Sequence, residues 1–170
     1  VDGDQFAGYN KIGLNVGGIM YLKLSEQLAA SMEILYSQKG SKSVQTKTIG
    51  TGYAITAYGI TLNYAEIPVL INLIDKHKSH FGAGFSYSRL ATSSEYITTN
   101  PPQVFDLTKY PFNKSDINWI LSGNLHLWKG MYLNGRFQYS LIPIRDKIPQ
   151  SYAKATQYNN LWVMRLMYLF

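Results

Sequence analysis

Cysteine is absent from all 170 residues, and this absence excludes disulfide scaffolds, thiolate zinc sites and cysteine nucleophiles. Long apolar runs are also missing. The longest, residues 67–74, is interrupted by Pro68 and Asn72, and it falls well short of the roughly 18 residues of a membrane-spanning helix. The chain is therefore not a helical membrane protein. A membrane β-barrel stays open, because barrels carry their apolar residues in alternation.

Charge is sparse and scattered. Only 15% of the residues are charged, and the net charge is +6. Except for Lys11, near the start of an apolar-patterned run, the lysines fall in short turn-like segments or in long polar stretches, Lys39 among them, and they form no basic helix. We therefore expect solvated loop lysines and no nucleic-acid partner, with lipid phosphates as the better-placed anions. The high apolar (46%) and aromatic (14%) content excludes disorder and predicts one domain over residues 1–170.

The dominant hydrophobic period is two, which indicates half-apolar β-strands. Seven runs show it: residues 12–22, 28–37, 57–73, 81–88, 117–127, 133–141 and 162–170. The third and seventh runs are apolar in both phases, so their faces are less well defined. The connections between runs alternate strictly between short turns and long polar stretches; the long ones are residues 40–56, 91–115 and 143–157. This alternation predicts an up-and-down antiparallel transmembrane β-barrel with tight turns on one rim and long extracellular loops on the other.

The polar face of the runs carries small residues and few charges, as expected for a narrow lumen rather than a wet surface. Its four charged residues, Glu33, Glu66, Arg136 and Arg165, predict a lumen charge network. The favoured role of this network is structural, because eight-stranded barrels are packed with side chains, and the alternative is a proton or ion path. The apolar face carries aromatic residues near the strand ends, which predicts two interfacial girdles.

Strand parity leads to one further expectation. Seven strands place the two chain ends on opposite rims, whereas bacterial single-chain barrels have even strand numbers. We therefore expect an eight-stranded barrel whose first strand lies before Val1, with residues 1–9 as the end of a first long loop. The sequence shows no signal peptide, and we expect that one has been trimmed.

Four stretches carry a family resemblance: VDGDQFAGYNKIGLNVG (1–17), EILYSQKG (33–40), YAEIPVL (64–70) and LMYLF (166–170). With these stretches the chain resembles the PorT-like outer-membrane β-barrel proteins of Gram-negative bacteria. The resemblance implies an outer-membrane location, a preceding strand and signal peptide, and a C-terminal signal, Tyr168 and Phe170, that the barrel-assembly machinery reads during biogenesis. It implies function only weakly, through one secretion-associated member.

Catalytic and metal-binding patterns are weak in this sequence. No two histidines share metal-ligand spacing with a carboxylate, so no zinc site is expected. Ser122 and His126 lie in the same phase, but four residues along a strand separate them by roughly 13 Å, too far to hydrogen-bond. We expect no enzyme, no cofactor and no metal.

The function that the sequence favours is a small, non-enzymatic outer-membrane barrel. Its lipid-embedded scaffold presents the long loops to a protein, glycan or lipid partner, and its role is structural or accessory in secretion or assembly. Two alternatives stay open, a soluble lipocalin-like barrel that binds a small apolar ligand and a narrow, porin-like pore.

Overall fold

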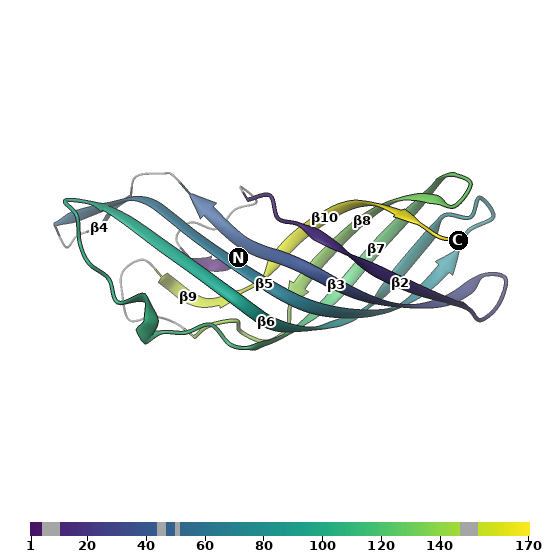
Figure 1. Cartoon of the computed structure of the whole chain (residues 1–170), viewed down its shortest axis with the longest axis horizontal. Helices are drawn as coiled ribbons and strands as arrows, with labels where there is room; N and C mark the ends of the chain where they lie inside the picture. The colour runs from purple at the N-terminus through teal and green to yellow at the C-terminus, as the bar shows by residue number, and fades with distance from the viewer. Residues whose placement is uncertain (5–10, 44–46, 50–51, 147–152) are drawn as a thin grey trace.

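The computed structural model describes residues 1–4, 11–43, 47–49, 52–146 and 153–170. Seven long strands form one antiparallel sheet in the order β10-β8-β7-β6-β5-β3-β2. Their bounds are β2 Asn15–Lys23, β3 Leu28–Ser43, β5 Tyr53–Ile74, β6 His80–Asn100, β7 Ser115–Trp128, β8 Met131–Ser140 and β10 Asn160–Tyr168. Each strand pairs with its neighbour in the chain, so the predicted up-and-down topology is confirmed. The sheet curls into a half-barrel (Figure 1).

Three short strands and one short helix lie at the end of the sheet where the connections are long. β4 (Lys47–Ile49) pairs with β5, β1 (Asp2–Asp4) pairs with β9 (Ala153–Tyr158), and η1 (Leu107–Lys109) is a single 3-10 turn. The C-terminus lies at the opposite end, among the short turns (Figure 1). The expected first long loop therefore contains a strand, β1, while residues 5–10 lie outside the described part of the chain.

The exterior is apolar and the interior is polar. Val69, Phe85 and Trp162 are 52%, 61% and 67% exposed, whereas Glu66 and Asn118 are completely buried. A water-soluble barrel has the reverse distribution, because exposing large apolar side chains to water is unfavourable. The prediction that the apolar phase of the runs faces outward is confirmed.

The apolar phase reverses along β5, and the reversal marks the edge of the lipid-facing band. From Ala65 to Leu73 the alternate residues that face outward are apolar. Beyond Tyr64 the apolar side chains of Ile60 and Leu62 are buried on the inner face instead. Residues 65–73 have the length that a tilted strand needs to cross a bilayer, about nine residues. The third run is apolar in both phases because it spans both environments.

Strands β3, β5 and β6 are longer, and the loops that join them on the long-loop side are shorter, than the sequence predicts. β6 continues through Asn100 and takes the first ten residues of the predicted loop 91–115. β3 continues to Ser43, and β5 begins at Tyr53, so most of the predicted loop 40–56 that the structure describes is strand as well. Above the band, that is on its long-loop side, most outward-facing residues of β6 are polar. Hydrophobic alternation therefore no longer indicates the strand there. Threonine and tyrosine nevertheless favour it through their β-propensity.

A lysine scan across the reversal tests where the band ends. Val69→Lys puts a charge in the middle of the lipid-facing face, and we expect it to lower the free energy of unfolding in vesicles by about 2–4 kcal/mol. Thr98→Lys, exposed on the outer face of β6 above the band, is the matched control and should change stability by less than about 0.5 kcal/mol. Urea unfolding in lipid vesicles measures both, and equal effects would contradict the assigned boundary.

The sheet is open between β2 and β10. Both strands run from the long-loop end to the short-turn end, and in the described part of the chain neither pairs with the other. Two cavities of about 610 and 580 Å³ lie between their edges, and the Arg165 guanidinium reaches across to the Asn15 side-chain oxygen, 3.0 Å away. Unpaired strand edges are not viable in lipid. One strand antiparallel to both would pair these edges, so the eighth strand expected from parity stays a prediction.

Engineered cysteines test this seam, since the native chain has none. In the full-length protein, Met20→Cys should form no disulfide with cysteine at Met164, Leu166 or Tyr168. An intervening strand sets the two edges about 9–10 Å apart, beyond disulfide reach. Met20→Cys with Met32→Cys, a register pair on β2 and β3, is the positive control. A β2–β10 disulfide in mature protein would show instead that a seven-stranded barrel closes on itself.

Candidate functional site: a filled lumen under a folded cap

The part of the lumen nearer the short turns, here called the lower lumen, holds a cluster of one carboxylate and two guanidinium groups from three strands. The two Glu33 oxygens each bind one arginine, Arg136 and Arg165, at 2.5 Å. The Glu33 and Arg136 side chains are 1% and 2% exposed. Arg165 also donates to the Asn134 side-chain oxygen at 2.9 Å. The cluster therefore ties together β3, β8 and β10 inside the barrel.

A second cluster lies higher in the lumen. The Lys39 ammonium lies 3.4 Å from Glu66 and 3.7 Å from Asp116, and all three side chains are buried. Gln138 donates to the other Glu66 oxygen at 3.0 Å, and Asn159 donates to Asp116 at 2.8 Å. Amide side chains thus donate further hydrogen bonds to one oxygen of each carboxylate.

All four predicted network residues lie in the lumen, but their pairing is not one acid to one arginine. Glu33 binds both arginines, and Glu66 pairs with Lys39, which the sequence analysis placed among solvated loop lysines. That placement of Lys39 is wrong, and Asp116 was missed. The signal was present, because Lys39 shares the phase of Glu33 on one strand. Taken together, Glu33, Glu66 and Asp116 balance Lys39, Arg136 and Arg165 in charge.

A third ion pair closes the loop-side mouth. Arg145 binds both oxygens of Glu95, at 2.7 and 2.8 Å, and the two side chains are 3% and 5% exposed. The same guanidinium donates to the Gln157 side-chain oxygen at 2.9 Å and lies 4.0 Å from the centre of the Phe112 ring. The bidentate geometry fixes the orientation of both partners. Sequence analysis missed this pair, because it lies in segments predicted to be loops.

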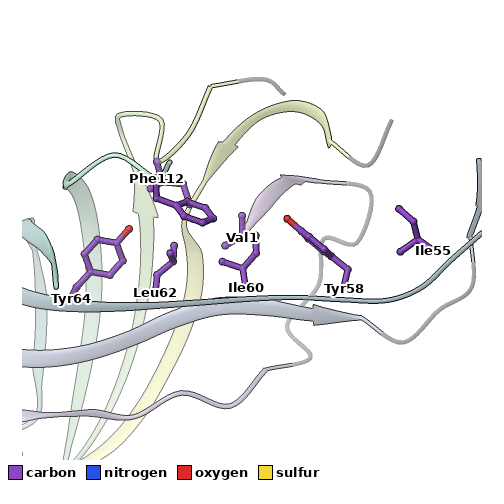
Figure 2. Close-up of a cluster of buried hydrophobic side chains, with 8 residues drawn as sticks. Val1, Ile55, Tyr58, Ile60, Leu62, Tyr64 and Phe112 are labelled. Carbon is purple, nitrogen blue, oxygen red and sulfur yellow. The ribbon is translucent and has the colours of Figure 1, made fainter. Parts of the chain in front are cut away.

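An apolar cluster fills the space beside this ion pair. Tyr58, Ile60, Leu62 and Tyr64 stand on one face of β5 opposite Phe112 and Val1, as Figure 2 shows. Ile55 and Ile144 complete the cluster. This apolar-inside arrangement is that of a water-soluble domain. We call the part of the molecule above the band, residues 53–63, 91–114, 143–146 and 153–158 with Val1, the cap.

These features agree with the family comparison. The family model described as "Outer membrane protein beta-barrel domain" matches residues 3–146. The chain belongs to this family. No curated protein and no solved structure matches the chain. The barrel domain is thus an outer-membrane protein, and the narrower PorT-like assignment stays a prediction.

In the part of the chain that the structure describes, no helix is long and apolar enough to span a membrane. The same residues contain no group of three or more His, Asp or Glu side chains that could hold a metal ion.

The residues weighed for catalysis are engaged in structural contacts. Ser122 Oγ accepts a hydrogen bond from Asn134 at 2.8 Å. His126 bonds to the Lys129 carbonyl oxygen at 2.7 Å through Nε2, close to a short turn of the barrel domain. His80 bonds to the Tyr21 hydroxyl at 2.9 Å. Ser122 and His126 thus have separate hydrogen-bond partners.

The proposed assembly signal lies on the outer face at the end of β10. The rings of Tyr168 and Phe170 contact each other edge to face, with centroids 4.9 Å apart, and both are exposed. An exposed aromatic pair at a strand end is the arrangement that an assembly factor can bind. Its recognition by the barrel-assembly machinery stays a prediction.

One exposed hydrogen-bonded pair of side chains lies at the short-turn rim. His77 Nδ1 lies 3.0 Å from a carboxylate oxygen of Asp75. This hydrogen bond holds the pKa of Asp75 below its ordinary value. Both groups are exposed to solvent, so the pair contributes little to stability.

Proposed function

We propose that this protein is a small, non-enzymatic outer-membrane barrel of a Gram-negative bacterium that presents its cap to a partner. Its role is structural or accessory, in secretion or assembly, as the resemblance to PorT-like proteins suggests. The observation that carries the proposal is the filled lumen. Two buried charge clusters and the Arg145–Glu95 pair occupy the interior from the turn side to the loop side.

The alternatives fit the interior less well. A barrel that binds a small apolar ligand needs an apolar cavity, whereas here the inward-facing residues within the band include many buried Ser, Asn, Gln and charged side chains. A pore needs a continuous aqueous path, and the paired charges and the apolar cluster lie across it. The cap, by contrast, is a folded structure outside the lipid band and suits the binding of another molecule. A surface protein or glycan is the partner that this position favours.

A deletion strain tests the proposal. We expect loss of the protein to lower the amount of at least one secreted or surface-assembled protein, while uptake of small hydrophilic solutes stays unchanged. Purified full-length protein should give no steady conductance in planar bilayers. Steady conductance, or slower solute uptake in the deletion strain, would contradict the proposal and support a pore.

A further inference from the structure

Among the described residues, one edge of β6 above the membrane band has no strand beside it. β6 pairs with β5 along its length, but its ladder with β7 ends at the pair Arg89–Ser115. The last backbone bond on that side runs from the Leu90 N–H to the Lys114 carbonyl oxygen, 2.8 Å away. Within the part of the chain that the structure describes, no strand pairs with residues 91–100 on this side. We call this side of residues 91–100 the cap edge; it is roughly 33 Å long at the usual rise.

The register shows which backbone groups point away from β5. The Thr98 carbonyl oxygen accepts a hydrogen bond from the Thr56 hydroxyl on β5, at 3.2 Å. Backbone groups of successive strand residues point to alternate sides. Those of Ser93, Glu95 and Ile97 therefore point to the cap edge, where no strand of the described part of the chain receives them.

The cap edge lacks the features that usually protect an exposed strand. Residues 91–100 contain no proline and no lysine. Their single charge, Glu95, is turned inward and held by Arg145. The other residues include Thr, Tyr and Ile, which favour strands. A long, exposed edge without lysine, proline or an inward-pointing unpaired charge is a template for strand addition.

The edge is also held in place before any partner arrives. The Tyr96 ring lies against Gly59 of β5 so closely that a Cβ at position 59 would come within 2.4 Å of a ring carbon. On the other face Ile97 packs against the apolar cluster of the cap. A strand that adds here meets a template that is already ordered, so little conformational entropy is lost on this side of the interface.

Orientation and charge select the partner. Two copies in one membrane point the same way across it, so their β6 strands run in the same direction and their cap edges cannot pair antiparallel. A polypeptide segment that is not fixed in the same membrane can pair antiparallel with the cap edge. At the lower end of the edge the side chains of Arg89 and Lys114 are exposed, and they would attract carboxylates there.

We propose that the cap edge binds an extended segment of a partner polypeptide as an added antiparallel strand. Because β6 runs upward from Arg89, the C-terminal end of that segment lies beside Arg89 and Lys114, and it carries acidic residues. This inference rests on the proposed function and names the chemistry of the partner that the cap receives.

The test uses the full-length barrel in detergent and two synthetic peptides of about ten residues that alternate threonine and valine. One ends in two aspartates and the other begins with them.

Ser93→Pro removes an N–H that points to the cap edge and leaves the β5 ladder intact, as proline does on edge strands. Ser94→Ala, whose side chain lies on the outer face, is the matched control. Arg89→Gln with Lys114→Gln removes the charges at the lower end, and fluorescence anisotropy measures binding.

We expect the C-terminally acidic peptide to bind the native barrel and the Ser94→Ala variant alike, and Ser93→Pro at least about tenfold more weakly. The double Gln variant should lose the preference between the two peptides. No binding to the native barrel, or equal binding to Ser93→Pro, would overturn the inference. If Ser93→Pro does not fold, the double Gln variant decides alone. A conducting barrel would contradict the proposed function, whereas a closed barrel that binds neither peptide contradicts only the cap edge.

Discussion

Glu33→Leu is expected to lower the free energy of unfolding of the barrel strongly. It leaves the buried guanidinium groups of Arg136 and Arg165 without their shared carboxylate. Breaking a buried ion pair by removing one partner costs about 3–5 kcal/mol, because the remaining charge stays desolvated. Urea unfolding in vesicles should show a loss of this size.

Glu26→Leu is the control for Glu33→Leu, because it removes the same charge from an exposed turn and should change stability by less than about 0.5 kcal/mol. Glu33→Gln should lie between the two, since the amide oxygen still accepts one hydrogen bond but its nitrogen faces the second arginine. If Glu33→Leu unfolds at the urea concentration of the native barrel, the lower cluster does not hold β3, β8 and β10 together.

Arg145→Leu is expected to open the cap while the barrel beneath it stays folded. The substitution leaves the Glu95 carboxylate buried without its cation and removes the guanidinium from the Phe112 ring. The local cost is about 3–5 kcal/mol, and it falls on a part of the molecule outside the lipid band. Limited proteolysis should therefore cleave the variant within residues 101–114 much faster than the native protein.

Lys109→Leu removes an exposed cation from the same segment, and its cleavage rate should match that of the native protein. The heat-dependent gel shift of the barrel should be the same in both variants. A lost gel shift in Arg145→Leu would show that the cap and the barrel fold as one unit. An unchanged cleavage rate would show that the ion pair does not hold the cap closed.

The lipid-facing strands were predictable from sequence because one physical rule governs them. Within the band the outward residue must be apolar and the inward residue small or polar, so the period of two is visible over, for example, residues 117–127. The inward phase also identified Glu33, Glu66, Arg136 and Arg165. Which of these charged groups pair with one another was not predictable, because pairing depends on how far the curled sheet brings distant strands together.

The cap was not predictable, because no single rule of alternation governs its residues. Residues 91–100 are strand, yet they are polar on most positions of both faces, and the apolar residues of β5 change face at Tyr64. A single alternation rule fails where the chain leaves lipid and enters water. Arg145 and Glu95 both lie in the cap, in segments without a hydrophobic period, and only the tertiary fold brings them within 2.7 Å.

The most direct measurement of the central claim, a closed barrel with an apolar exterior in lipid, is the gel mobility of the full-length protein from outer membranes. Samples in SDS are compared unboiled and boiled. A closed barrel pairs its backbone groups internally and resists SDS until it is heated, so we predict faster migration of the unboiled sample. Equal mobility of the two samples, with the protein recovered in the soluble fraction, would contradict the account.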